Sequence, residues 1–521
     1  MNGAGSLLRS LIDNDVDVCF SNPGTSEMHF VAALDDVPEM RGILALFEGV
    51  ATGAADGYGR VTGKPAGVLL HLGPGLGNGL ANLHNARRAR TPVVTIVGDH
   101  ATTHARYDAP LQSDIVSVAG TLSTFLRVSA SPNDVGADAA DAVAGAMGPP
   151  SGVATLILPA DVSWGEVSSP SRPTTHHVAR AVVDPDNVRA AAHALRAARR
   201  PALLIGGSAV ASEEALDDAA RIADISGAIL MMETFPSIAA RGAGTPQISR
   251  LGYLAEFAAA QLDGVDLILT VDAAAPASFF AYPAFESNLV PEGADVMAFA
   301  GPSQDVPRSL AALADELGAA AAPVAPVLSS RPDRPQGRLT SEALGAAIGG
   351  AITEGMVVVD ESNTGGIHVA GATAGAPRHD WLTLTGGAIG YGLPAAVGAA
   401  VGRPEVRILC LESDGSAMYT LQALWTMARE SLNVTVVLLS NRSYAILNLE
   451  LARVGAVAEG SAAASMLDLT GPELDFVSLA KGMGVPASRA ETADELVKAL
   501  EAASTAEGPV LIEAMLPAGL S

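Results

Sequence analysis

Residues 407–416 read Arg-Ile-Leu-Cys-Leu-Glu-Ser-Asp-Gly-Ser, an apolar strand that runs directly into Asp414 and a glycine. A second apolar strand over 434–439 is followed by Asn441, and we expect a helix over 421–430 between the two strands. The carboxyl ends of neighbouring parallel strands meet at one edge of a sheet, where ligands of open α/β folds gather. Magnesium prefers oxygen ligands and shares itself with phosphates. This stretch therefore predicts a magnesium and diphosphate site on a parallel sheet.

Short apolar strands alternate with helix-like segments along the rest of the chain, and this alternation predicts further parallel sheets. Two stretches rich in Ser and Pro, 168–177 and 323–338, have the composition of linkers. We therefore expect an α/β protein with three doubly wound parallel-sheet domains, over residues 1–167, 185–322 and 340–521. Hydrophobic residues make up 49% of the 521 residues, which is enough to fill three such cores.

Charge and cysteine usage restrict the class of protein. The formal net charge of −25 argues against a nucleic-acid partner, because an acidic chain repels a phosphate backbone. No apolar run reaches the roughly 20 residues of a membrane helix, and the N-terminus lacks the apolar core of a signal peptide. Cys19 and Cys410 lie in apolar strand-like stretches, as buried free thiols of a reducing compartment do. We expect a soluble cytoplasmic protein.

A second motif begins at Glu48, which lies in an otherwise apolar stretch. This acid either stabilises the N-terminus of a helix through the helix dipole or acts as a general acid. The run from Glu48 to Tyr58, E-G-V-A-T-G-A-A-D-G-Y, and the spacing from Asp414 to Asn441 together resemble the thiamine-diphosphate-dependent enzymes. Their signatures are E-x-x-A-x-x-x-A-D-G-Y-A and, at the other end of the chain, G-D-G followed by an Asn.

The resemblance covers essentially the whole chain, and it implies thiamine diphosphate and Mg²⁺ as cofactors. Asp414 and Asn441 are implied to bind the metal through their side chains, and Ser443 through its backbone carbonyl. Two departures from the motif are mild, because Ser413 and Arg442 replace residues that supply no metal side chain. Further residues implied to bind the cofactor are Asn363, Gly387, Ile389, Gly415, Ser416 and Tyr444.

The resemblance also implies roles for Glu48 and Ile389 beside the organic part of the cofactor. The resemblance makes Glu48 the acid that activates the pyrimidine ring, and Ile389 the side chain beneath the bent cofactor. Ordinary core packing is the alternative for Ile389. In this family the two halves of a site come from different subunits, so the resemblance implies a homodimer or homotetramer with active sites at subunit interfaces. A small 2-oxo acid is the implied substrate.

Two branches of the family compete, the acetolactate synthase large subunits and benzoylformate decarboxylase. The segment 22–27, Asn-Pro-Gly-Thr-Ser-Glu, is similar to the decarboxylase turn that contacts the substrate carboxylate, which makes Thr25 and Ser26 catalytic candidates. His71 matches the active-site histidine of that enzyme and suits proton transfer near neutral pH, although a structural role is the alternative. The decarboxylase has a second histidine, for which the stretch 277–283 offers none.

By whole-chain likeness we predict an acetolactate synthase-like decarboxylase and carboligase. Simple decarboxylation of an aromatic or branched 2-oxo acid is the alternative that His71 favours. A catalytically silent, cofactor-binding homologue is an alternative of another class. The acetolactate synthase branch also leaves FAD as a further cofactor, but no motif in the middle segment supports it.

Overall fold

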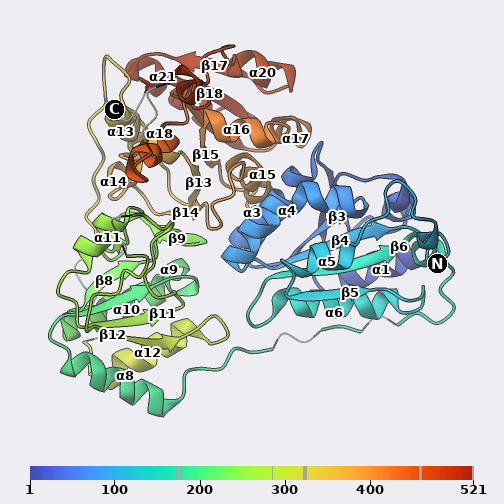
Figure 1. Ribbon diagram of the computed structural model, residues 1–521, viewed down its shortest axis with the longest axis horizontal. Helices are drawn as coiled ribbons and strands as arrows, with labels where there is room; N and C mark the ends of the chain where they lie inside the picture. Colours follow the sequence, from blue (N-terminus) through green and yellow to red (C-terminus); the bar gives the residue numbers. More distant parts are fainter. Residues whose placement is uncertain (172, 176–177, 284–285, 321–325, 457–459, 519–521) are drawn as a thin grey trace.

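The strands of this protein form three separate sheets (Figure 1). The computed structural model describes residues 1–171, 173–175, 178–283, 286–320, 326–456 and 460–518. Within these residues the three-domain α/β fold class is confirmed. Cys19 and Cys410 are buried and unpaired, as expected. None of the described helices has the length and apolar character needed to cross a membrane.

The N-terminal sheet has six parallel strands in the order β2-β1-β3-β4-β6-β5. Apolar side chains fill both of its faces, as a doubly wound sheet requires. The strands are β1 (Val18–Ser21), β2 (Arg41–Leu44), β3 (Ala66–Leu70), β4 (Val93–Asp99), β5 (Phe125–Val128) and β6 (Val153–Pro159). The helices are α1 (Gly3–Asp13), α2 (Met28–Ala33), α3 (Glu48–Thr62), α4 (Leu72–Ala89), α5 (Ile115–Gly120), α6 (Val135–Met147) and α7 (Ala160–Trp164), with 3₁₀ turns η1 (Thr25–Glu27), η2 (Leu34–Asp36) and η3 (Ala105–Tyr107).

The middle sheet has five parallel strands in the order β10-β8-β7-β11-β12. Its strands are β7 (Pro201–Ile205), β8 (Ile229–Met232), β10 (Ser249–Arg250), β11 (Leu267–Val271) and β12 (Asp295–Ala300). The helices beside it are α8 (Pro185–Ala197), α9 (Ser208–Ala211), α10 (Glu213–Ser226), α11 (Ala255–Gln261) and α12 (Val306–Leu317).

The C-terminal sheet has seven strands in the order β17-β18-β16-β15-β13-β14-β9. Its strands are β13 (Met356–Glu361), β14 (His379–Thr383), β15 (Ile408–Ser413), β16 (Val434–Ser440), β17 (Ala487–Ala490), β18 (Val510–Met515) and β9 (Ile238–Arg241). Its helices are α13 (Ser341–Ala351), α14 (Val369–Ala372), α15 (Gly392–Gly402), α16 (Asp414–Thr420), α17 (Ala423–Arg429), α18 (Ala445–Arg453), α19 (Ser461–Ser465), α20 (Phe476–Gly482) and α21 (Ala493–Ser504), with the 3₁₀ turn η4 (Asn363–Gly366).

Two features of this sheet differ from the sequence expectation. Strand β9 comes from the middle segment and pairs antiparallel with β14, so the sheet is parallel except at this edge. The expected helix over 421–430 is present as α17, but a further helix, α16, begins at Asp414 directly after β15 and was not expected. The apolar pattern marked the buried part of α17, whereas the polar residues of α16 belong to the site.

Helices α3 and α15 join the N-terminal and C-terminal domains (Figure 1). Small residues allow the two helices to approach closely, since a Cβ on Gly57 would overlap the backbone of Ala395 and one on Gly398 would overlap that of Ala54. A single apolar cluster runs through this contact from one domain into the other.

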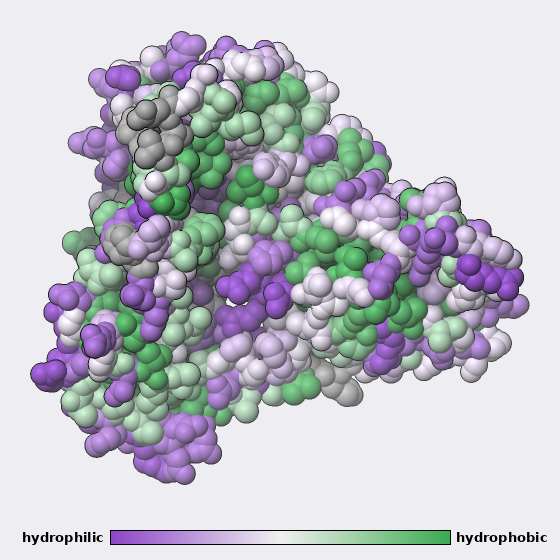
Figure 2. Space-filling model, in the orientation of Figure 1, coloured by the Kyte–Doolittle hydropathy of each residue, from purple (hydrophilic) through white to green (hydrophobic). Residues whose placement is uncertain are grey.

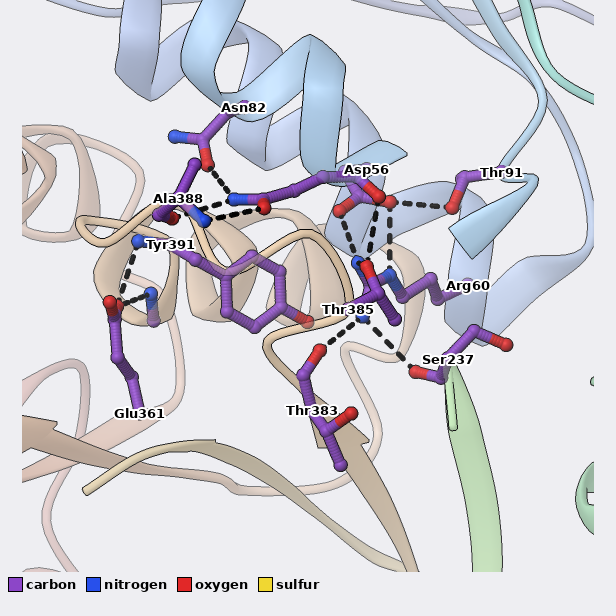
Figure 3. Close-up of polar contacts among 12 residues, drawn as sticks. Asp56, Arg60, Asn82, Thr91, Ser237, Glu361, Thr383, Thr385, Ala388 and Tyr391 are labelled. Carbon is purple, nitrogen blue, oxygen red and sulfur yellow. Dashed lines mark hydrogen bonds and ion pairs between the residues drawn. The ribbon is translucent and has the colours of Figure 1, made fainter. Parts of the chain in front are cut away.

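A buried ion pair lies in the same contact (Figure 3). Arg60 bonds Asp56 at 2.6 Å, and both side chains are almost inaccessible. The Arg60 guanidinium also donates to the carbonyls of Thr383, at 2.7 Å, and Ser237, at 3.2 Å. Thr383 belongs to the C-terminal domain and Ser237 to the middle segment, so one buried arginine ties three parts of the chain together. A buried charge that lost these partners would be strongly destabilising.

Candidate active site

The C-terminal edge of the third sheet carries the predicted metal ligands. Asp414 is the first residue of α16 and is 3% exposed. Its Oδ1 accepts the N–H of Gly415 at 2.8 Å and its Oδ2 accepts the N–H of Arg442 at 2.6 Å. Burial raises the pKa of Asp414, and the backbone hydrogen bonds, that of Arg442 first, oppose this. A cation beside this buried carboxylate would favour its charged form.

Asn441 directly follows the neighbouring strand β16, as the sequence predicted, and β15 and β16 are paired with Ser413 opposite Leu439. Its side chain is buried, and its Oδ1 accepts the N–H of Ser443 at 3.1 Å. The Ser443 hydroxyl donates to the carbonyl of Leu467 at 3.2 Å. The segment after β16 is therefore held by its own polar groups beside Asp414.

The donor set at this edge suits a hard divalent ion. It consists of one carboxylate, one side-chain amide and nearby backbone carbonyls, which are the oxygen ligands that magnesium shares with phosphate groups. Nowhere among the described residues do three or more His, Cys, Asp or Glu side chains gather in a way that could hold a metal ion. The residues thus fit an ion that brings phosphate oxygens with it.

Hydroxyl and amide groups surround the position next to the metal ligands. Asn363 Nδ2 donates to the hydroxyls of Ser413, at 2.7 Å, and Ser416, at 3.1 Å. Asn363 has a φ of +48°, a left-handed conformation that Asn adopts more readily than most residues. The Tyr444 ring packs on Gly415, where a Cβ would lie 2.5 Å from the ring. These residues place hydroxyl and amide groups where a diphosphate could accept hydrogen bonds.

The loop 385–390, which contains the predicted cofactor-binding residues Gly387 and Ile389, is fixed by a buried carboxyl group. Glu361 accepts the N–H groups of Gly390, Tyr391 and Gly392 at 2.8, 2.7 and 2.5 Å. Burial raises the pKa of Glu361 to about 7. Burial, and after it the neighbouring Glu361, raise the pKa of Glu412 well above its ordinary value.

Two asparagines of α4 hold the same loop from the other side (Figure 3). Asn85 exchanges hydrogen bonds with the backbone of Ala388, at 2.8 and 3.2 Å. Asn82 donates to the carbonyl of Gly390 at 3.2 Å and to the carbonyl of Gly49 at 2.8 Å. Between these contacts Ile389 is half-buried and lies outside the fully buried core. Gly387 has a φ of +73°, which glycine adopts without strain.

Glu48 is the first residue of α3 and is 8% exposed. Its Oε2 accepts a hydrogen bond from Asn78 Nδ2 at 3.0 Å, so the carboxylate points toward α4. The Asn82 side chain donates to the carbonyl of Gly49, which follows Glu48, and to the carbonyl of Gly390, which follows Ile389. The start of α3 and the 385–390 loop therefore approach each other at α4.

His71 and the 22–27 turn lie together at the carboxyl ends of the paired strands β1 and β3. The His71 ring packs on Gly24, where a Cβ would overlap it. A hydrogen bond of 2.9 Å joins His71 Nδ1 to Glu27 Oε2, which also accepts the N–H of Gly24 at 2.8 Å. Burial raises the pKa of Glu27, and the interaction with His71 opposes this first. Thr25 is exposed and Ser26 half-exposed beside the pair.

The sequence reasoning missed three carboxyl groups of this region. Glu27 was quoted only as the last residue of the turn, although an acid there can orient the histidine of the next strand. Glu361 and Glu412 each end an apolar strand, and they are paired with each other across β13 and β15. An acid at the end of a fully apolar strand is a usable signal, because a buried carboxyl group needs hydrogen-bond partners.

Comparison with known proteins places this architecture in a family. The N-terminal TPP binding domain of thiamine pyrophosphate enzymes matches residues 1–119, and the C-terminal TPP binding domain matches residues 365–514. A Mycobacterium tuberculosis protein, provisionally named an acetolactate synthase large subunit (IlvX), is 56% identical over 519 residues, which is 99% of each chain. The chain belongs to the thiamine pyrophosphate enzymes.

Decarboxylases are also among the similar members of this family. Benzoylformate decarboxylase of Pseudomonas aeruginosa is 30% identical over 95% of each chain. The solved structure of a 4-hydroxybenzoylformate decarboxylase from Rhodococcus jostii RHA1 has a TM-score of 0.87 at 25% identity and covers 100% of both chains. Both branches weighed from the sequence are therefore represented among the relatives of this thiamine pyrophosphate enzyme.

Proposed function

We propose that this thiamine pyrophosphate enzyme is a Mg²⁺-dependent decarboxylase of an aryl 2-oxo acid. The observation that carries the proposal is the Glu27–His71 pair, held over the Gly24 turn. Bound thiamine diphosphate would supply the electron sink that lets a 2-oxo acid lose carbon dioxide. A histidine oriented by a buried carboxylate is suited to deliver the proton that then completes an aldehyde.

The cofactor's charged end is assigned to the C-terminal domain. Asp414, Asn441 and the Ser443 carbonyl would hold Mg²⁺, because they are the hard oxygen donors at the ends of β15 and β16. The diphosphate would lie over Gly415, between the Asn363 and Ser416 side chains and near the Tyr444 ring. Ser416 and Asn363 are already oriented toward each other, so little ordering would accompany binding.

The cofactor's ring end is assigned to the loop over residues 385–390. The Gly387 carbonyl would accept the ring amine, and Ile389 would support the bent cofactor, which its half-buried position permits. Glu48 would hold a proton at the pyrimidine ring. Glu361 acts only through the loop backbone, so it is a positioning residue.

A second subunit would complete each site, as a homodimer or homotetramer. Apolar side chains near both halves of the site support this assembly. Leu46, two residues before Glu48, is 47% exposed, and Met418 and Tyr419 on α16 are 43% and 52% exposed. Large apolar side chains that remain exposed beside a functional site are typical of a covered subunit interface.

An aromatic group beside the cofactor loop favours an aryl substrate. The Phe279 ring lies 3.9 Å from the position that a Cβ on Gly387 would take. Phe279 contacts Phe235 and Tyr253, each with a ring-centroid separation of 5.2 Å, yet remains 44% exposed. An exposed aromatic face next to the loop would stack well on a phenyl ring and poorly on the methyl group of pyruvate.

Helix α18, which follows Tyr444, contacts Tyr282 from the same stretch as Phe279. Tyr282 donates to Glu450 at 2.8 Å, and the Arg453 guanidinium lies 4.4 Å from the Tyr282 ring centroid. Arg453 also forms an ion pair with Glu256 of α11. Residues of the middle segment therefore hold α18 in place.

Carboligation is the second candidate, because the 56% identical relative is named for acetolactate synthase. Incubation of the protein with pyruvate, thiamine diphosphate and Mg²⁺ separates the two candidates: acetolactate would support ligation, and its absence with turnover of aryl 2-oxo acids would support decarboxylation. Asp414→Asn tests the metal assignment in the same assay, since it should weaken the joint binding of Mg²⁺ and cofactor. Full cofactor binding without turnover of any 2-oxo acid would indicate a silent homologue.

A further inference from the structure

The middle sheet has the topology of a nucleotide-binding fold at one position. Strand β7 pairs with β8 on one side and with β11 on the other, so the strand order reverses between β7 and β11. Ligands of open α/β sheets bind outside the carboxyl ends of the strands at such a switch point. Gly206, Gly207 and Ser208 follow β7 there, and Asp272 follows β11. This is the place in the middle domain where the phosphates of a flavin nucleotide would be expected.

Side-chain carboxylates of the chain itself occupy the phosphate-binding groups of this turn. Glu233 Oε1 accepts the N–H of Gly207 at 3.0 Å. Asp272 Oδ2 accepts the N–H and the hydroxyl of Ser208 at 3.0 and 3.2 Å. A phosphate would have to displace both side chains from these N–H groups or lie against the Asp272 carboxylate, and either requirement opposes anion binding.

The arginine that contacts this turn is already paired. Arg90 follows helix α4 of the N-terminal domain, and its Nη1 bonds Asp272 Oδ1 at 2.5 Å while its Nη2 bonds the Asp272 carbonyl at 3.2 Å. The Asp272 side chain in this pair is only 4% exposed, against 31% for Arg90. The interaction links the N-terminal and middle domains in place of a ligand.

The space left at this junction is small. A cavity of about 180 Å³ remains there, lined by the arginines Arg60, Arg90 and Arg180 together with Gly207, Ser208 and Asp272. Figure 2 shows a hollow between the two domains with hydrophilic residues around it. Sites for ligands of even modest size have volumes of roughly 300–1,000 Å³, so a dinucleotide would not fit without separating the domains.

We propose that the middle domain of this chain binds no FAD or other nucleotide: Glu233 and Asp272 occupy the turn that would bind its phosphates, and the Arg90–Asp272 pair replaces the ligand as a protein-only link between two domains. These residues therefore do not fit FAD, which the resemblance to the acetolactate synthases had left open as a further cofactor. The proposal is independent of the substrate and of the fate of the decarboxylated intermediate.

The test has two arms on the full-length protein. Visible absorbance and fluorescence of the purified chain should show flavin far below one per chain, and calorimetric titration with FAD and with ADP should show no saturable binding. Flavin that copurifies in stoichiometric amount, or saturable binding of either nucleotide, would overturn the exclusion. A flavoprotein of known stoichiometry serves as the positive control.

The second arm measures the link itself. Arg90→Gln should lower the thermal unfolding midpoint, because Asp272 loses its charged partner. Arg199→Gln is the matched control, since Arg199 also pairs with an aspartate of the middle domain, at 3.4 Å, but has a side chain that is 92% exposed. Equal behaviour of the two variants would overturn the role of the link.

Discussion

Replacement of Glu233 by glutamine removes an ionisable group without removing its hydrogen bond. Burial raises the pKa of Glu233 to about 7 from an ordinary value of 4.5, and the Gly207 N–H and the nearby arginines oppose this only in part. The carbonyl oxygen of a glutamine can accept the same N–H from Gly207, which now lies 3.0 Å from Oε1. The variant therefore isolates the free-energy cost of ionising this side chain in the folded protein.

The size of the effect follows from the two pKa values. Between about pH 4.5 and about pH 7 the unfolded chain has released this proton and the folded chain has kept it, so the native protein loses stability as the pH rises through that window. The difference between the two pKa values corresponds to about 3 kcal/mol. Glu233→Gln should match the native protein near pH 4.5 and exceed it by up to about 3 kcal/mol near pH 8.

Denaturant and thermal unfolding across this pH range measure the difference. Because a chain of three domains need not unfold in one step, the transition that contains the middle domain should be compared between variants. Glu292→Gln, at an exposed position of the same domain, controls for the change of net charge. A Glu233→Gln difference that does not change with pH, or a variant less stable than the native protein near pH 8, would refute the reasoning.

Three further predictions concern the site. Glu48→Gln should lower kcat by about 100-fold or more while cofactor titration still saturates, and unchanged turnover would exclude Glu48 as the activating acid. Glu27→Gln and His71→Ala should each slow aldehyde formation. The double variant should be little slower than His71→Ala, because Glu27 acts through the His71 imidazole. Fully additive losses would mean that the two residues act independently. Phe279→Ala should lower kcat/KM for benzoylformate roughly tenfold with little change for pyruvate. The control Phe257→Ala, at a 61% exposed position of the same domain, should change neither value. Equal losses on both substrates would mean that Phe279 does not select for an aryl group.

The parts of the fold that sequence could predict are those with local signals. The strands β3, β4, β6, β13, β15 and β16 follow from short apolar runs, and the pairing of β15 with β16 brings Asp414 and Asn441 together as expected. The turn over residues 22–27 and His71 also lie together, because they follow the adjacent parallel strands β1 and β3. In each case the sequence shows both the polar residue and the end of the apolar strand that it follows.

The remainder depends on contacts between distant residues. Strand β9 joins the C-terminal sheet only through pairing with β14, and its sequence does not show which sheet it completes. The hydrogen bonds of Glu361 to the 390–392 backbone and of Glu233 to Gly207 bridge separate segments, so no local pattern reveals them. Long-range polar pairing thus determined the details of the site that the sequence left open.

The most direct test of the proposed chemistry is the product balance on benzoylformate. Protein freed of cofactor by chelation and dialysis is reloaded with thiamine diphosphate and Mg²⁺, and carbon dioxide and benzaldehyde are measured together. The Glu27–His71 pair predicts one aldehyde for each carbon dioxide, and no turnover without the metal. Carbon dioxide accompanied by a 2-hydroxy ketone in place of the aldehyde, or no release from any aryl 2-oxo acid, would contradict the account.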